Sequence, residues 1–187
     1  MSTADVYKIE DKSFKKYMSS NELKEIVADT AGKINSYYAD LVSEDKPLIM
    51  VGVLNGCFMF LSDLMKKINL PCEVHFIKVS SYEGTESSGT VTNVLGLTKD
   101  IKDQHVIIVE DIVDTGLTIS NLMNELNKKG PTTLNICTLL FKYQKYEGDI
   151  KIRFIGKTIM NLFVLGYGLD YNYLGRNLDS IYALVDS

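Results

Sequence analysis

Three acidic side chains lie close together near the middle of the chain, and a loop of small and hydroxyl-bearing residues follows them. Glu110 and Asp111 come directly after an apolar run at 106–109, and Asp114 follows three positions after Asp111. Residues 115–118 read Thr-Gly-Leu-Thr and lead into a helical pattern. The N-terminus of a helix favours a phosphate, because its N–H groups are free and its dipole is positive. Acids beside that phosphate need a hydroxyl-rich or cationic group between them, so the segment predicts a site for a phosphorylated ribose with a divalent metal.

Simpler interpretations of the same residues exist. Two acids that close a strand are often only a solvated strand end, and Asp114 or Thr115 could serve merely as a helix N-cap. The loop changes the balance, because Gly116 lets a ligand approach the backbone closely and the hydroxyls of Thr115 and Thr118 add donors. The combination favours a binding site over a capped strand end.

The composition is that of an ordinary globular chain. Its 187 residues, 45% of them apolar and 24% charged, predict one domain over 1–187. The net charge of −4 argues against nucleic-acid backbone as the main ligand. The three cysteines, Cys57, Cys72 and Cys137, lack disulfide or zinc spacing, which indicates thiols of a reducing compartment. The first residues form no signal core and no apolar run is long enough to span a membrane, so we expect a cytoplasmic protein without a membrane partner.

Strand and helix signals alternate along the chain. Ser19 and Glu22 have the spacing of a capping box before a helical repeat of apolar residues. The Gly-, Ser- and Thr-rich stretch at 82–93 predicts a mobile functional loop. The alternation predicts an α/β fold with a parallel sheet, in which ligands bind at the carboxyl ends of the strands. Strands are expected at 48–54, 74–79, 106–109, 134–141, 161–166 and 180–185, and helices at 58–68 and from about 119 to a stop signal at 128–131.

The segment at 106–118 is similar to the phosphoribosyl-diphosphate-binding motif of the type I phosphoribosyltransferases. Other segments narrow the resemblance to the hypoxanthine-guanine phosphoribosyltransferases. Residues 139–142 (Leu-Leu-Phe-Lys) resemble the strand of that family that ends in a purine-contacting lysine, and 161–172 resembles its purine-pocket segment. The resemblance runs from about residue 8 to the end of the chain. It includes an arginine at position 176, Ser81-Tyr82 of the mobile loop and Leu54-Asn55-Gly56 of the first pyrophosphate loop.

The resemblance implies a fold, a reaction and a set of partners. The fold would be a twisted parallel sheet flanked by helices, with a small hood built from the N- and C-terminal segments. The reaction would belong to purine salvage: hypoxanthine or guanine is joined to phosphoribosyl diphosphate, giving IMP or GMP and pyrophosphate. The cofactor would be magnesium, the partners would be the sugar diphosphate and a 6-oxopurine without nucleic acid, and the chain would form a homodimer or homotetramer.

The resemblance also assigns roles to matching positions. Asp114 becomes the catalytic acid and base at purine N7, a task that suits a carboxylate. Magnesium favours one or two carboxylates with substrate oxygens and water, and the resemblance gives it Glu110, Asp111 and Asp170. Ribose 5-phosphate and its hydroxyls are assigned to Glu110, Asp111, Asp114, Thr115, Gly116, Leu117 and Thr118; pyrophosphate to Leu54, Asn55, Gly56 and Arg176; the purine to Lys142, Phe163, Val164 and Asp170; and the lid to Ser81 and Tyr82.

Two residues depart from the pattern of the family. Asn55 stands where many relatives have lysine, so we expect a change in diphosphate affinity or subunit coupling, but not in the reaction. Leu117 stands where some relatives have lysine, with little expected consequence because backbone N–H groups bind the phosphate. The Leu54–Asn55 bond is expected to keep the non-proline cis peptide of that loop.

Two other functions fit parts of the sequence. Some proteins with this fold are regulators that bind RNA or DNA and sense nucleotides, but the acidic charge and the set of Asp114, Lys142 and Asp170 weigh against that alternative. A phospho-accepting receiver also has acids at strand ends together with a lysine. In a receiver the acid pair belongs to the first strand, whereas Glu110 and Asp111 lie in the middle of the chain.

Overall fold

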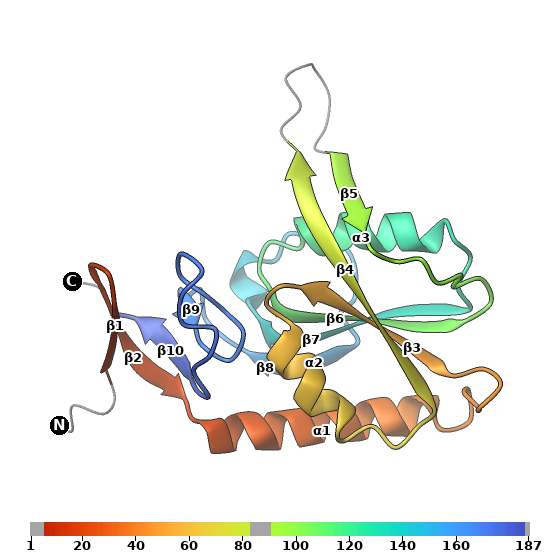
Figure 1. Cartoon of the computed structure of the whole chain (residues 1–187), viewed down its shortest axis with the longest axis horizontal. Helices are drawn as coiled ribbons and strands as arrows, with labels where there is room; N and C mark the ends of the chain where they lie inside the picture. Colours follow the sequence, from red (N-terminus) through yellow and green to blue (C-terminus); the bar gives the residue numbers. More distant parts are fainter. Residues whose placement is uncertain (1–5, 83–90, 186–187) are drawn as a thin grey trace.

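The computed structural model describes residues 6–82 and 91–185, and its larger sheet forms the centre of the molecule (Figure 1). This sheet has six strands in the order β5-β4-β3-β6-β7-β8. All neighbours pair in parallel except β4 and β5, which are antiparallel, so the predicted parallel sheet is confirmed. The strands are β3 (Leu48–Leu54), β4 (Cys72–Tyr82), β5 (Val91–Leu95), β6 (His105–Val113), β7 (Thr133–Phe141) and β8 (Phe154–Thr158).

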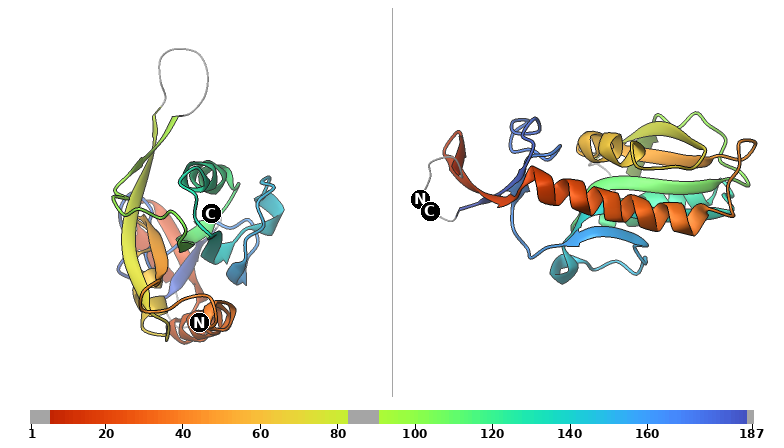
Figure 2. Two further views of the ribbon diagram at one scale, coloured as in Figure 1. Left: turned by 90° about the vertical axis from the view of Figure 1, so that its right-hand side faces the viewer. Right: turned by 90° about the horizontal axis from the view of Figure 1, so that it is seen from below.

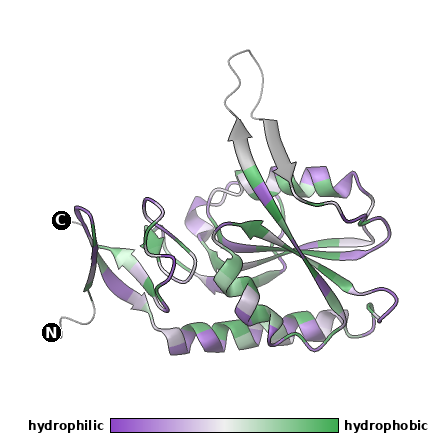
Figure 3. Ribbon diagram, in the orientation of Figure 1, coloured by the Kyte–Doolittle hydropathy of each residue, from purple (hydrophilic) through white to green (hydrophobic). Residues whose placement is uncertain are grey.

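Helices cover both faces of this sheet. The helices α1 (Ser20–Tyr38) and α2 (Phe58–Met65) pack on one face, and α3 (Leu117–Asn127) packs on the other. Successive residues of β3 alternate between the two cores: Met50 belongs to the first, whereas Ile49 and Val51 belong to the second. Burial on both faces explains why this strand is a continuous apolar run. Figure 3 shows the same concentration of hydrophobic residues in the central strands.

The start of α1 has the predicted capping box. The Ser19 hydroxyl accepts the N–H of Glu22 at 3.3 Å, and the Glu22 carboxylate accepts the N–H of Ser19 at 2.8 Å. Two free N–H groups at the helix start are thereby satisfied. The cysteines are all free thiols; Cys57 and Cys137 are buried, and Cys72 is partly buried.

A second, smaller sheet forms the hood. Its strands are β1 (Val6–Ile9), β2 (Lys12–Met18), β10 (Ile181–Leu184) and β9 (Val164–Leu165), in the antiparallel order β1-β2-β10-β9. The N- and C-terminal segments therefore lie side by side, as the family resemblance implied, and α1 leads from the hood along the central sheet (Figures 1 and 2). Ile9, Phe14, Leu165 and Tyr182 form a small core of its own within the hood.

Several elements differ from the sequence-based prediction. The strand expected at 74–79 extends to Tyr82 and forms a hairpin with β5, so Tyr82 and residues 91–93 of the expected loop lie in strands; residues 83–90 lie outside the described part. The strands β1, β2 and β8 were not predicted. The strand β1 is short and largely exposed, only two of the seven residues of β2 are buried, and β8 is an edge strand with Gly156 in it. Helix α2 ends at Met65 and not at the predicted residue 68, and α3 begins at Leu117 and not at the predicted residue of about 119.

The topological switch point of the larger sheet lies between β3 and β6. The chain passes from β3 to β4 on one side and returns to β6 on the other, which is the switch point at which open α/β sheets bind ligands. The pairing of β3 with β6 stops at Gly52 and Val109, so β6 continues from Glu110 onward beside β7 alone. Among the described residues, no helix is long and apolar enough to cross a membrane.

Candidate active site

The acid pair lies at the carboxyl end of β6, and neighbouring strand residues point to opposite faces. Glu110 is buried, and its burial followed by the charge of Asp111 raises its pKa well above the usual value. Burial also raises the pKa of Asp111 to about 6, although its carboxylate accepts the N–H of Ile112 at 2.9 Å. Each of these carboxylates has a raised pKa and would gain from a cation or from a hydroxyl donor beside it.

The loop after β3 lies directly against Asp111. A Cβ atom on Gly56 would be 1.6 Å from Asp111 Oδ2, so only glycine fits at this position. The peptide bond between Leu54 and Asn55 is cis, as the resemblance led us to expect. Asn55 is exposed, whereas Gly56 is buried. A Cβ atom on Gly168 would in turn be 2.1 Å from the carbonyl oxygen of Gly56, so the backbone at 168 packs on the same loop.

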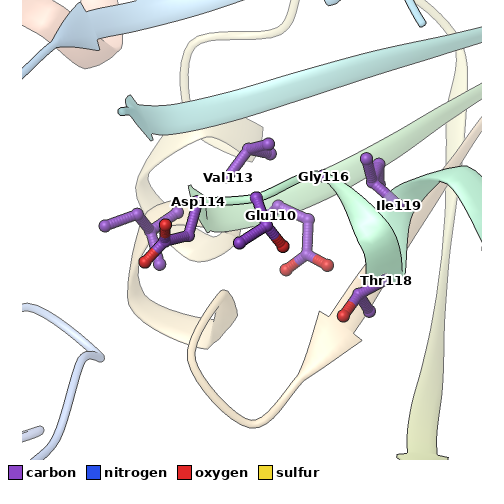
Figure 4. A pocket seen from close by; sticks show the side chains of 8 residues that line it. Glu110, Val113, Asp114, Gly116, Thr118 and Ile119 are labelled. Atoms are coloured by element: carbon purple, nitrogen blue, oxygen red, sulfur yellow. The ribbon is translucent and has the colours of Figure 1, made fainter. Parts of the chain in front are cut away.

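A pocket of about 110 Å³ lies between the end of β6 and the start of α3 (Figure 4). Gly116, with φ of 90°, is the N-cap of α3, and no side chain caps the helix. Asp114 is therefore free of the capping role, although the Thr115 hydroxyl accepts the N–H of Leu117 at 3.4 Å. The first N–H groups of a helix have no acceptor within it and suit an anion. The residues that line the pocket are Glu110, Ile112, Val113, Asp114, Thr115, Gly116, Thr118 and Ile119.

Asp114 is held by two lysines. Lys142, the residue directly after β7, is buried, and its Nζ lies 3.0 Å from Asp114 Oδ2. Lys145 Nζ lies 3.1 Å from both carboxylate oxygens. Burial by itself raises the pKa of Asp114, but the hydrogen bonds and charges of the two lysines together outweigh it and lower the pKa below the usual value. Asp114 is therefore ionised at neutral pH.

The sequence analysis missed Lys145. It ends the 3₁₀ turn η2 (Tyr143–Lys145), whose N-cap is Lys142. Side chains three residues apart eclipse each other in a 3₁₀ turn, so the spacing Lys-x-x-Lys puts both ammonium groups on one side. The spacing Lys-x-x-Lys directly after a strand was therefore the sequence signal that could have identified Lys145.

The segment around β9 and the loop that follows it contribute the remaining predicted purine and pyrophosphate residues. The ring of Phe163 is 46% exposed and meets Tyr171 edge-on at 5.8 Å, whereas Val164 is buried. The Asp170 carboxylate pairs with Arg176 at 2.7 Å, and Arg176 also donates to the carbonyl oxygen of Gly168 at 2.6 Å. The charge of Arg176 lowers the pKa of Asp111 and that of Asp170 raises it, so both charges act electrostatically on the end of β6. Ser81 and Tyr82 are the last two residues of β4, and the structure describes only their backbone.

The acidic side chains at the end of β6 suit a cation that a substrate also binds. Within residues 6–82 and 91–185, no three His, Cys, Asp or Glu side chains are arranged as a metal cage. Magnesium does not require such a cage, because it keeps several waters and binds through one or two carboxylates plus substrate oxygens. Glu110 and Asp111 each supply a carboxylate of this kind, and the charge of Asp170 acts on Asp111.

Comparisons with known proteins agree with this site. The model of the phosphoribosyl transferase domain matches residues 15–172. The hypoxanthine phosphoribosyltransferase of Haemophilus influenzae is 38% identical over 169 residues, which are 90% of this chain and 93% of that protein. The hypoxanthine-guanine phosphoribosyltransferase of Aquifex aeolicus is 37% identical, over 95% of this chain and 98% of that protein. A solved structure of the Trypanosoma cruzi hypoxanthine phosphoribosyltransferase has a TM-score of 0.86 at 31% identity, over 96% of this chain and 95% of that one.

These relatives are transferases, and they give no support to the alternative of a regulator that binds RNA or DNA. The likeness extends over both the central sheet and the hood, because each of these three relatives covers at least nine-tenths of the chain. The predicted fold and family are therefore confirmed. The chain is a phosphoribosyltransferase of purine salvage and belongs to the family of the hypoxanthine-guanine phosphoribosyltransferases.

Proposed function

We propose that this chain transfers the 5-phosphoribosyl group from phosphoribosyl diphosphate to hypoxanthine or guanine. Purine N9 forms a bond to C1′ of the ribose, the bond from C1′ to the pyrophosphate oxygen breaks, and the proton on N7 passes to Asp114. The products are IMP or GMP and pyrophosphate. In the reverse direction Asp114 returns the proton to N7, as a general acid does.

The observation that carries this proposal is the contact of 3.0 Å between Lys142 Nζ and Asp114 Oδ2. A 6-oxopurine presents O6 and N7 side by side on one edge. An ammonium group beside a carboxylate matches O6 as an acceptor and a protonated N7 as a donor. Adenine has an amino group at position 6, which would point donor hydrogens at the ammonium of Lys142. We therefore expect the site to select oxopurines over aminopurines.

The sugar diphosphate would bind along the carboxyl ends of β3 and β6. The pocket beside α3, with the backbone of residues 114–118, would hold the 5-phosphate, and Glu110 and Asp111 would hold the ribose hydroxyls. Backbone N–H groups of residues 54–56 and the Arg176 guanidinium would bind pyrophosphate. Phe163 would stack on the base, the backbone of Val164 and Asp170 would meet its two-position edge, and Ser81 and Tyr82 would close over the reacting centre and exclude water.

Magnesium is the cofactor that this site would take. Glu110, Asp111 and Asp170 would hold it together with substrate oxygens and water. When bound, it neutralises the charge that grows on the departing pyrophosphate. The carboxylates of the chain would also stabilise the positive charge that develops on the ribose ring as C1′ loses its leaving group.

The remaining features of the proposal concern the whole molecule. Residues 1–187 would act as one catalytic domain in the cytoplasm. The chain would assemble as a homodimer or homotetramer. Light scattering of the purified protein, with and without phosphoribosyl diphosphate, measures this assembly directly.

An assay of pyrophosphate release tests the function. The protein is mixed with phosphoribosyl diphosphate, magnesium and one purine at a time. We expect turnover with hypoxanthine and guanine, and a value of kcat/KM for adenine that is about 10⁴-fold lower, because the wrong group leaves buried polar atoms unpaired. Equal turnover of adenine and hypoxanthine would refute the assignment of Lys142. No pyrophosphate with any purine would refute the function itself.

A further inference from the structure

The Asp114 carboxylate has two lysine neighbours, but only Lys142 has a place in the reaction proposed above. Lys142 approaches Oδ2, whereas Lys145 lies 3.1 Å from each of the two oxygens. Oδ1 is closed off from solvent and accepts no well-aligned hydrogen bond from the described residues. The ammonium of Lys145 is therefore the group that reaches Oδ1.

Local structure holds Lys145 at this place. Lys142 donates its N–H to the carbonyl oxygen of Val113 at 3.0 Å, which joins the end of β7 to the end of β6. Glu147 donates its N–H to the carbonyl oxygen of Thr115 at 3.1 Å, which joins the end of the turn to the phosphate loop. Lys145 lies between these two attachments. Its side chain is 45% exposed, compared with 9% for Lys142, so it approaches Asp114 from the solvent side.

The reaction creates a conflict at Oδ2. Both lysines donate to this oxygen, Lys142 at 3.0 Å and Lys145 at 3.1 Å, and a carboxylate oxygen must face N7 to take its proton. When the ammonium of Lys142 turns toward purine O6, Asp114 loses part of its counter-charge while the base excludes water. A carboxylate in such surroundings is costly unless another cation stays with it.

We propose that Lys145 is a positioning residue. While Lys142 moves to the purine, Lys145 gives up its contact with Oδ2 and stays with Asp114 through Oδ1, so that Oδ2 is left to face N7. The two lysines then divide two tasks between them: Lys142 recognises the base, and Lys145 fixes the orientation and charge of Asp114. This inference rests on the proposed function.

Removal of the Lys145 charge shifts the pKa of Asp114 in a predictable direction. The charges and hydrogen bonds of Lys142 and Lys145 lower the pKa of Asp114 against the effect of its burial. Glu110, an acid that lines the same pocket, gives no positive charge that could replace them. Without Lys145 the pKa of Asp114 rises. Because Asp114 accepts a proton only when it is ionised, the forward reaction then loses rate at acidic pH and keeps it at alkaline pH.

The test compares Lys145→Gln, Lys145→Arg and wild type in single-turnover assays of phosphoribosyl transfer to hypoxanthine across the pH range. Lys151→Gln is the matched control, because it removes a charge from an exposed lysine in the adjoining loop. We expect Lys145→Gln to move the acid limb of the rate profile to higher pH, with a several-fold loss at acidic pH. Lys145→Arg should restore most of the wild-type profile, and Lys151→Gln should leave it unchanged.

Other outcomes separate this inference from the function on which it rests. If wild type transfers no phosphoribosyl group, the proposed function is wrong. If wild type is active and the profile of Lys145→Gln keeps the acid limb of wild type, whether at full rate or reduced equally at every pH, Lys145 does not act through the charge of Asp114. A shift of the same size in Lys151→Gln also overturns the inference, because it would reflect net charge alone.

Discussion

The hydroxyl of Tyr167 donates a hydrogen bond of 2.6 Å to the carboxylate of Asp63. Asp63 belongs to α2, which follows the loop at 54–57, and Tyr167 precedes Gly168, which packs on that loop. Burial and the contact with Asp63 raise the pKa of Tyr167, so its hydroxyl stays protonated and remains a donor. The hydrogen bond therefore fastens the predicted purine segment to the element behind the predicted pyrophosphate loop.

Tyr167→Phe removes this hydrogen bond and little else. We expect the free energy of unfolding to fall by about 1.5 kcal/mol, the lower end for a bond to a charged group, because Asp63 keeps Lys66 at 2.7 Å. We also expect the KM values for the base and for the sugar diphosphate to rise together, and kcat to fall by a smaller factor. Loss of this hydrogen bond would displace the backbone at 167–168, which belongs to the predicted purine segment and packs on the predicted pyrophosphate loop. Urea denaturation and steady-state kinetics measure these effects. Tyr173→Phe, at a residue that is 85% exposed, is the control, and an equal effect there would show that the contact with Asp63 is irrelevant.

Gly56→Ala tests the contact between the loop after β3 and the acid pair. The new Cβ atom would be 1.6 Å from Asp111 Oδ2, so Asp111 or the loop must move. Overpacking of this kind costs about 1–3 kcal/mol of stability, and we also expect weaker binding of phosphoribosyl diphosphate, with an even larger loss for Gly56→Val. Gly32→Ala in α1 is the matched control, because nothing lies within 4 Å of its Cβ position. That control should gain about 0.5–1 kcal/mol. Calorimetry measures the stability and ligand titration measures the binding. If Gly56→Ala and Gly56→Val both bound the diphosphate as wild type does, close contact between this loop and Asp111 would not matter for binding.

Asn55 provides the test of whether backbone or side chain binds pyrophosphate. Its side chain is exposed, so Asn55→Ala should change the KM for phosphoribosyl diphosphate only modestly. Asn55→Lys should strengthen the binding of phosphoribosyl diphosphate by about 1.5 kcal/mol at best, because solvent screens an exposed charge. Both variants are measured beside Gly56→Val at the same magnesium concentration. If Asn55→Ala is as damaging as Gly56→Val, the asparagine side chain is itself a ligand.

Asp114→Asn keeps the shape of the side chain but removes the proton acceptor. We expect the single-turnover rate to fall by roughly 10²–10⁴-fold. Binding of the sugar diphosphate should be largely kept, because the phosphate loop acts mainly through its backbone. Single-turnover conditions are needed, since slow product release would hide the loss in kcat. Asp40→Asn, an exposed aspartate after α1, should behave as wild type. An unchanged chemical rate in Asp114→Asn would remove Asp114 from the role of acid and base.

Local sequence patterns were sufficient for much of this protein. The capping box at Ser19 and Glu22, the apolar run of β3 and the acid pair near the end of β6 each contain their own signal within a few residues. Those signals follow from the periods of helices and strands and from the chemistry of helix ends, which do not depend on distant parts of the chain. The sequence therefore predicted the parallel sheet, and it predicted a phosphate loop directly before a helix, where the structure has α3.

Only the tertiary structure decided how distant segments meet. The short strands β1, β2 and β8 have weak patterns of their own, and their place depends on pairing with partners elsewhere in the chain. The contact of Gly56 with Asp111 joins residues 55 positions apart, and that of Asp114 with Lys145 joins residues 31 apart. No local pattern encodes such distances, because they arise when strand order brings the carboxyl ends of β3, β6 and β7 to one edge of the sheet. The sequence by itself determined which side chains could do the chemistry, and the sheet decided which of them touch.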